Sequence, residues 1–108
     1  MTDDRLFQII VYVPASHCEV VKDALFAVGA GSYDLYDRCS WQTGGVGQFR
    51  PLAGSTPFIG TQNQTECVEE LRVEMICRQA LLSRAVDALK QAHPYETPAY
   101  HVLALENY

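Results

Sequence analysis

The chain has 108 residues, a length that suits one domain with a single hydrophobic core. Hydrophobic residues make up 48% of the sequence and charged residues 19%, which excludes wholesale disorder. The formal net charge is −5 and no basic stripe is present, so we expect neither nucleic acid nor a membrane as a partner. No apolar run approaches the roughly 20 residues that a membrane-spanning helix needs.

The four cysteines are widely spaced and form no C-x-x-C pair, which disfavours a zinc ribbon or a dithiol redox motif. The segment from Met1 to Arg5 is acidic and lacks the charged-then-apolar pattern of a secretion signal. We therefore expect a cytoplasmic protein whose cysteines stay reduced.

The first half of the chain is predicted to form a strand, a helix and a second strand. Leu6 to Val13 is a short apolar run rich in β-branched residues, typical of a central strand covered on both faces. Ser16-x-x-Glu19 has the capping-box spacing and predicts the start of a helix. That helix is expected to end at Gly29-Ala30-Gly31, and Ser32 to Thr43 is predicted to be the second strand.

The second half repeats this order. Val68 to Arg78 alternates between apolar and polar residues and predicts a strand, while Gln79 to Ala92 has an amphipathic helical stripe. Pro94 should end that helix and force His93 out of the helical region. Tyr100 to Leu105 is the last predicted strand. The sequence therefore predicts one domain over residues 1–108 with an α+β, ferredoxin-like βαβ-βαβ fold, an antiparallel sheet and two helices on one face.

In this fold the second face of the sheet has no helix to cover it. Leu6, Ile10, Tyr12 and Ile76 are predicted to lie on that face. An uncovered apolar sheet face usually marks an interface between subunits. We therefore expect a homo-oligomer.

A glycine-rich stretch, Thr43 to Leu52, lies between the two halves, and the excursion continues to Gly60. Gly44-Gly45-Val46-Gly47 could form a nest of backbone N–H groups for an anion. The stretch lacks the spacing of the known phosphate-binding loops and is followed by an apparent strand. A tight hairpin turn is therefore the simpler interpretation.

A second concentrated stretch runs from His93 to Tyr100. Pro94 and Pro98 should stiffen it and project His93, Tyr95 and Glu96 in fixed directions. An imidazole and a carboxylate at this spacing could share a metal ion or act as an acid–base pair. Alternatively, His93 interacts with the carbonyl groups at the helix end and Glu96 is simply solvated.

Other candidate residues carry a weaker pattern. Cys39 could be a metal ligand or a reactive thiol, although free cysteines are more often buried as small apolar groups. His17 would need metal-binding partners from elsewhere in the fold, and His101 is expected to be structural. No serine–histidine–acid triad or carboxylate pair has a recognisable spacing, so no catalytic residue is assigned.

The chain resembles the domain inserted into YqfO-type members of the NIF-three-like dinuclear-metal-centre family, also described as type 2 GTP cyclohydrolase-like. The matching motifs span nearly the whole chain: Tyr12-Val13-Pro14, Gly29-Ala30-Gly31, Gly45-x-Gly47-x-Phe49-x-Pro51-Leu52, Pro57-Phe58-Ile59-Gly60, Glu69-Glu70-x-Arg72-x-Glu74, His93-Pro94-Tyr95-Glu96-x-Pro98-Ala99-Tyr100 and Leu105-Glu106-Asn107.

The resemblance implies a CutA/PII-like domain that forms trimers through its sheet and handles ligands or metals near the clefts between subunits. The parts of the family that hold the dinuclear metal centre are not in this sequence. We therefore expect a stand-alone domain and do not transfer a cyclohydrolase or hydrolase activity to it.

These observations predict a non-catalytic, homo-oligomeric regulatory module, with a trimer as the expected state, that binds a small molecule or a metal ion. The expected ligand-binding residues are Gly45, Gly47, Phe49, Tyr95, His93 and Glu96. The alternative is a divalent-metal protein with Cys39, His93 and Glu96 as ligands, and a small hydrolase is the third possibility. The identity of any cofactor is unknown, and a divalent metal ion and a protein partner both stay open.

Overall fold

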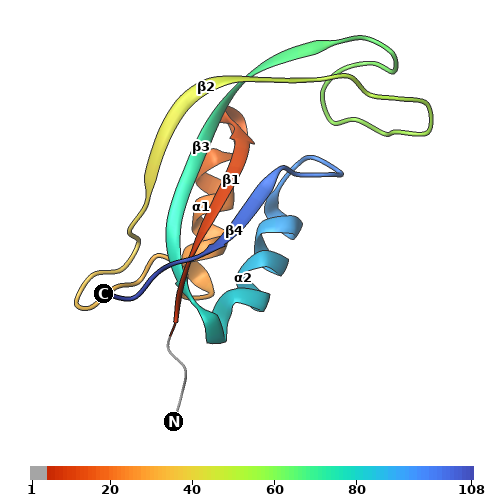
Figure 1. The fold of residues 1–108 in the computed structure, drawn as a ribbon. Coiled ribbons are helices and arrows are strands. Elements are labelled where there is room, and N and C mark those ends of the chain that lie inside the picture. The colour runs from red at the N-terminus through yellow and green to blue at the C-terminus, as the bar shows by residue number, and fades with distance from the viewer. Residues whose placement is uncertain (1–4) are drawn as a thin grey trace.

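The computed structural model describes residues 5–108, which form a four-stranded antiparallel sheet with two α-helices on one face (Figure 1). The sheet has the order β2-β3-β1-β4, which confirms the predicted ferredoxin-like α+β fold. The acidic start of the chain, residues 1–4, lies outside the described residues. The elements in chain order are β1 (Leu6–Pro14), the 3-10 helix η1 (Ala15–His17), α1 (Cys18–Ala27), β2 (Trp41–Phe49), β3 (Glu66–Arg78), α2 (Gln79–Ala92) and β4 (Tyr100–Ala104).

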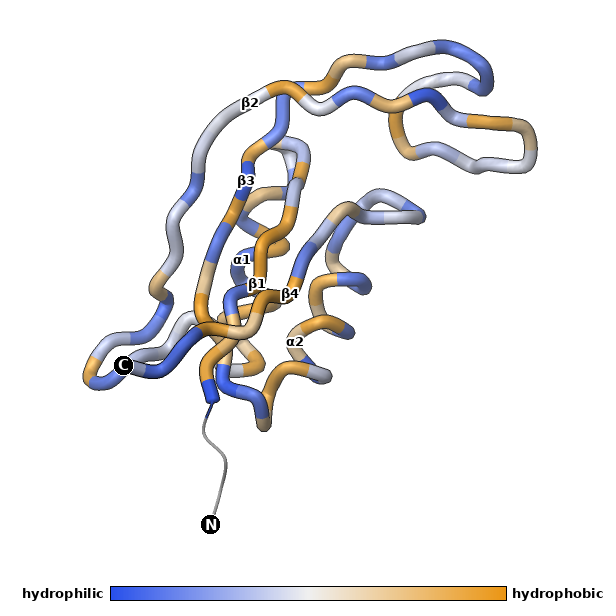
Figure 2. Tube along the Cα trace, in the orientation of Figure 1, coloured by the Kyte–Doolittle hydropathy of each residue, from blue (hydrophilic) through white to orange (hydrophobic). Residues whose placement is uncertain are grey.

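The core lies between the sheet and the two helices. Alternate residues of β1 point at the helices because successive side chains of a strand face opposite ways. Ile9, Val11 and Val13 are fully buried there, and Figure 2 shows β1 as a mostly hydrophobic segment. Each such side chain contributes roughly 1.5–3 kcal/mol by leaving water. Their buried partners in the core are Cys18, Val21, Leu25, Ala30, Val73, Met75, Cys77, Ala85 and Leu89.

The ends of the two helices were predicted with mixed success. Gly29 and Gly31 follow α1 with φ angles of 101° and 77°, the left-handed conformation that glycine adopts most easily, so that helix end is confirmed. His93 has extended backbone angles directly after α2, as predicted from Pro94. The capping box is wrong: Ser16 lies in η1 and its Oγ contacts the neighbouring His17 Nδ1, at 2.8 Å, rather than capping α1.

The predicted second strand at Ser32 to Thr43 overlaps β2 only at its end, so its predicted start is wrong: β2 begins at Trp41. The segment before it turns sharply: Tyr33 and Tyr36 form an isolated bridge, and Asp34 and Arg38 have left-handed φ angles of 52° and 56°. Asp tolerates this conformation and favours turns. The apolar residues between these positions misled the prediction, since they are exposed rather than buried.

The glycine-rich stretch is part of β2 and not a hairpin turn. Gly44, Gly45 and Gly47 pair with Leu71, Glu70 and Val68 of β3 in a continuous antiparallel register. The glycines with positive φ in this region are instead Gly54 and Gly60, which lie in the long loop at residues 50–65. The long partner strand explains the error, because pairing along β3 overrides the weak strand propensity of glycine.

β2 and β3 extend beyond the rest of the sheet. Pairing between β1 and β3 stops at Pro14 and Glu70, whereas pairing between β2 and β3 continues to Phe49 and Glu66. The two strands therefore form a projecting arm, which bends over the end of the sheet and carries the long loop at its tip (Figure 1). The molecule is elongated, with extents of 51 × 24 × 24 Å.

Neither helix covers the second face of the sheet, as predicted (Figure 1). The register places Gln8, Arg72, Glu74 and His101 on this face together with the expected apolar residues. The Gln8 side-chain amide donates to Glu74 Oε1 at 2.7 Å, and Arg72 lies 3.5 Å from the same oxygen. The open face is therefore mixed in polarity. Among residues 5–108, no helix is long and apolar enough to cross a membrane.

Candidate functional site

A groove of about 770 Å³ lies under the projecting arm. Its walls come from three parts of the chain that are distant in sequence: β2, the loop at residues 50–65, and the connector between α2 and β4 at residues 93–99. Figure 1 shows the loop and this connector lying beside the bent arm at the same end of the molecule. The size is that of a small-molecule site, for which grooves of roughly 300–1,000 Å³ are typical.

The floor of the groove is the open face of the sheet. Tyr12, Glu70 and Arg72 line it from β1 and β3. Gly45 pairs with Glu70 in the sheet, so a side chain at this position would project from the same face. Nothing lies within 4 Å of the place where a Cβ would stand at Gly45. The glycine therefore leaves open space where most residues would put a side chain.

Gly47 makes room for a neighbouring side chain. A Cβ at Gly47 would collide with the Glu70 carboxylate, which lies directly over the glycine backbone. Neither Gly45 nor Gly47 has a positive φ angle. These glycines thus provide room above the strand rather than an unusual backbone conformation.

Tyr95 closes the groove on the connector side. Its hydroxyl group donates a hydrogen bond of 2.8 Å to Glu70 Oε2. Burial raises the pKa of Tyr95 well above its usual value, and the hydrogen bond and negative charge of Glu70 raise it further. The phenol therefore stays protonated and keeps donating. Its ring also contacts Phe49, with the ring centroids 5.9 Å apart.

The loop is tied to the same connector. The carboxylate of Glu96 accepts a hydrogen bond from the Thr56 backbone N–H, at 3.0 and 3.2 Å to its two oxygens. Phe58 lies between the ring of Tyr95, at 6.4 Å, and the ring of His17, at 5.3 Å. One charged hydrogen bond and an aromatic cluster therefore hold the loop over the groove.

His93 does not line the groove, but it holds the connector that carries Tyr95 against β1. Its Nδ1 accepts a hydrogen bond from the Tyr95 backbone N–H at 3.1 Å, which fixes the ring proton on Nε2. Nε2 in turn donates to the Tyr12 carbonyl oxygen at 2.7 Å. Burial lowers the pKa of His93, and the nearby His17 lowers it further, although the Tyr12 carbonyl and Glu70 act against this shift. The ring is held neutral with both nitrogens occupied.

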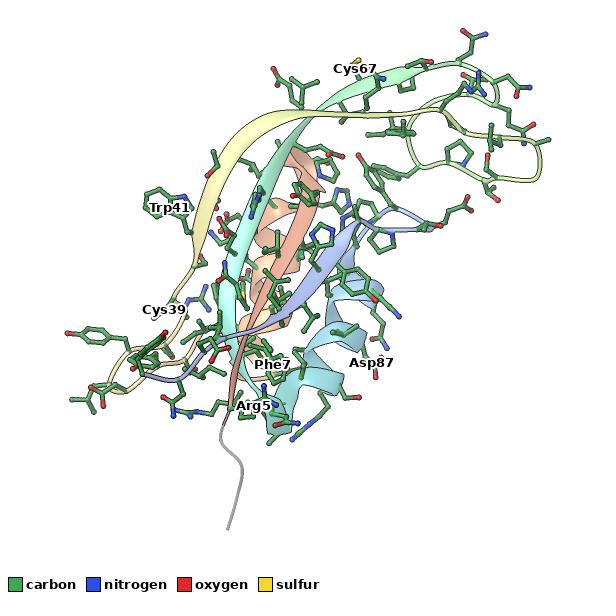
Figure 3. All side chains as sticks on the ribbon, in the orientation of Figure 1. Arg5, Phe7, Cys39, Trp41, Cys67 and Asp87 are labelled. Carbon is green, nitrogen blue, oxygen red and sulfur yellow. The ribbon has the colours of Figure 1, made fainter. Side chains whose placement is uncertain are left out.

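The three predicted metal ligands do not come together in one chain. Cys39 lies just before β2, at the opposite end of the molecule from the loop at residues 50–65 (Figure 3). His93 uses both ring nitrogens internally, and Glu96 holds the loop. Within residues 5–108, no group of three or more His, Cys, Asp or Glu side chains is placed to hold a metal ion.

Five of the six predicted ligand-binding residues are brought to one place, and His93 is the exception. Gly45, Gly47, Phe49, Tyr95 and Glu96 all line the groove. Sequence reasoning did not assign Tyr12, Glu70 and Arg72 to the site. The pattern that points to them is the alternation along β3, which puts Glu70 and Arg72 on the open face, together with their place in the motifs of the family resemblance.

Solved structures define the class of fold. CutA from Archaeoglobus fulgidus, described as a periplasmic divalent cation tolerance protein, superposes with a TM-score of 0.68 at 16% identity, covering 95% of this chain and 86% of that chain. GlnK from Bacillus subtilis gives a TM-score of 0.61 at 14% identity, covering 94% and 85%. At these identities the similarity shows the fold alone: this is a CutA/PII-like, ferredoxin-like domain.

Curated proteins of similar sequence match nearly the whole chain. A GTP cyclohydrolase 1 type 2 homolog from Halalkalibacterium halodurans is 40% identical over 106 residues, or 98% of this chain and 28% of the relative. The Bacillus subtilis protein of the same description is 37% identical over 103 residues, or 95% and 28%. The structure of a Bacillus cereus protein related to NIF3 has a TM-score of 0.84 at 36% identity, covering 99% of this chain and 27% of that chain.

These findings confirm the predicted resemblance to the NIF-three-like family. The chain spans only about a quarter of the length of the curated relatives it matches. No protein-family model matches the chain.

Proposed function

We propose that this protein is a regulatory module that binds a small molecule in the groove under its projecting arm and acts as a homo-oligomer. The groove itself is the observation that carries the proposal. Its volume suits a small ligand, and aromatic rings and a few polar groups converge on it from three separate segments.

The glycines of β2 support a binding role. Gly45 keeps the floor open, and Gly47 makes room for the Glu70 carboxylate that anchors Tyr95. A strand gains stability from side chains that pack on its face, so glycine at these positions costs stability. The need to leave space for a ligand would explain why glycine stands at these positions despite this loss of stability.

The acidic side chains of the groove support binding rather than catalysis. Glu70 accepts the Tyr95 hydroxyl and Glu96 accepts the Thr56 amide, so both carboxylates already hold the walls together. A general acid or base must instead reach a proton of the substrate. The cyclohydrolase description of the relatives is not extended to this chain, because the chain matches only about a quarter of their length.

The homo-oligomer is proposed from the open face of the sheet. Leu6 and Ile76 are only partly buried on this face, and Leu103 of β4 is 49% exposed. A second copy of the chain would remove this apolar surface from water, which is the driving force for most subunit association. The trimer predicted from the family resemblance is the state that we propose.

A compound screen by thermal unfolding tests the groove. A ligand present at a hundred times its Kd should stabilise the folded protein by about 2.7 kcal/mol. In Gly45→Leu the new side chain fills the groove, so this stabilisation should disappear. Gly44→Leu is the matched control: the backbone of Gly44 also lines the groove, but a side chain there projects from the other face of β2, toward Leu71. Equal stabilisation of both variants by every binding compound would contradict the proposal.

A further inference from the structure

The charged groups around the groove differ in how much of their hydrogen-bonding capacity is already used within the chain. Glu96 uses both oxygens for the Thr56 amide, and Glu70 accepts the Tyr95 hydroxyl. By contrast, Arg72 has a single ionic contact, at 3.5 Å to Glu74, and that oxygen is already shared with Gln8. A guanidinium group carries five N–H donors, so most of those on Arg72 remain available.

Arg50 adds a second cation at the rim of the groove. It is exposed, and within residues 5–108 its guanidinium group makes no hydrogen bond or ion pair. The two carboxylates keep spare acceptor sites, but the charged donors that the groove can offer a ligand come from Arg72 and Arg50. This holds although the whole chain carries a net charge of −5. Charge of this sign attracts a ligand with an anionic group.

The aromatic residues define the other half of the site. Phe49 and Phe58 both contact Tyr95, at centroid distances of 5.9 and 6.4 Å, and all three rings line the groove. Such rings favour a flat aromatic partner, which can stack or pack edge to face.

The aromatic rings and the cation of Arg72 lie a short distance apart. Tyr95 is bonded to Glu70, and Arg72 is two residues further along β3, which corresponds to about 7 Å of strand. The guanidinium group of Arg72 also lies over the ring of Tyr12, 5.9 Å from its centroid, so the cation is positioned beside the open floor.

We propose that the ligand of this groove is a planar aromatic molecule with an anionic group, the ring packing against Phe49, Phe58 and Tyr95 and the anion binding Arg72. This assignment rests on the proposed function, because it names the ligand class for the same groove. The spacing of about 7 Å suits a ring system of two fused rings with one charged substituent.

Two fluorescent naphthalene probes test the ligand class. 1-Anilinonaphthalene-8-sulfonate carries a sulfonate, and N-phenyl-1-naphthylamine is the same scaffold without it. The wild-type protein should bind the sulfonate at least about tenfold more tightly than the neutral probe, as expected for a charged hydrogen bond. Arg72→Gln should remove most of this preference, and Arg50→Gln a smaller part of it. Arg84→Gln on the exposed surface of α2 changes the net charge equally and should keep the full preference.

The outcomes separate this inference from the proposed function. If Gly45→Leu abolishes binding of both probes but the sulfonate gives no preference, the groove binds small molecules and the anionic class is wrong. A preference that survives in Arg72→Gln would likewise overturn the role of Arg72. If both probes bind Gly45→Leu as well as wild type, they bind elsewhere, for example at the exposed Leu35 and Tyr36, and the groove itself fails as a binding site.

Discussion

His93 and Tyr95 are two residues apart, yet they act on opposite sides of the groove wall. His93 is buried and bridges the Tyr12 carbonyl and the Tyr95 amide, which ties the connector to β1. Tyr95 turns toward the groove and ties the connector to β3 through Glu70. One histidine thus positions the backbone from which the aromatic side chain projects.

Replacing His93 with Ala should lower the free energy of unfolding. The Tyr12 carbonyl and the Tyr95 N–H would both lose their partner in a buried place, and an unsatisfied buried group costs about 1–3 kcal/mol. Urea unfolding measures this loss. Arg84→Ala is the control, because Arg84 is exposed on α2, away from His93 and from the open face of the sheet. Equal losses in the two variants would contradict the structural role of His93.

The lowered pKa of His93 should also make the stability of the fold depend on pH. Burial lowers the pKa of His93 in the folded state, with His17 acting in the same direction and Glu70 against it. The unfolded chain has a histidine pKa of about 6.5, so below this pH it binds more protons than the folded chain does. The stability that His93 contributes should be complete above pH 6.5 and be lost progressively below it. Urea unfolding between pH 7.5 and pH 5 should show this fall, and it should be weaker in His93→Gln.

At the scale of elements, the sequence predicted most of the fold because hydrophobic periodicity reports burial directly. The alternation from Leu71 to Cys77 and the stripe of α2 are both found as predicted. The start of β2 was missed because Tyr33, Leu35 and Tyr36 are apolar but exposed, which periodicity cannot distinguish from a core strand. The sequence predicted the groove residues on β2 and on the connector but missed those of its floor. The floor depends on the register between β2 and β3, which no local sequence pattern reveals.

The two groove glycines should respond differently to the same small change. Gly47→Ala should displace the Glu70 carboxylate and weaken the Tyr95 contact, at a cost of about 1 kcal/mol. Gly45→Ala enters open space and should be neutral or slightly stabilising, because alanine loses less conformational entropy on folding. Thermal unfolding of the pair compares the two effects. A larger loss at Gly45 than at Gly47 would contradict the proposed reasons for these glycines.

The loop at residues 50–65 should loosen when its charged tether is removed. Glu96→Ala deletes the acceptor of the Thr56 N–H, which is otherwise exposed to solvent exchange. Hydrogen exchange at the Thr56 amide should become at least about tenfold faster, while the core strands keep their protection. Glu69→Ala, an exposed glutamate on the arm, is the control and should leave the exchange rate of Thr56 unchanged. An equal rate in both variants would show that the aromatic cluster alone holds the loop.

At the scale of the whole molecule, the elongated shape separates two features. The groove lies beneath the arm and the long loop, and the exposed turn at residues 33–36 lies at the other end of the ribbon in Figure 1. The open sheet face runs between them. Subunit association through the part of this face that carries Leu6, Ile76 and Leu103 would leave the groove end open and bring several grooves into one assembly.

Sedimentation velocity at micromolar concentration should give a mass that is a multiple of the 12.1 kDa chain, with three copies as the expected number. Ile76→Arg would place a charge on the open face and should dissociate the assembly. Val20→Arg on the exposed surface of α1 should not, since that residue is 55% exposed on the opposite side of the molecule. A wild-type chain that is monomeric across this concentration range would rule out the proposed oligomer.

The central claim is that a small molecule binds in the groove, and backbone amide NMR on the wild-type protein with the naphthalene sulfonate tests it most directly. The groove is built from segments that are distant in sequence. Binding should therefore shift amides at residues 43–49, 56–59 and 95–99 together, and the same titration should leave residues 33–36 unchanged. Shifts confined to residues 33–36, or spread along the outer surfaces of the helices with none in the groove, would contradict the account.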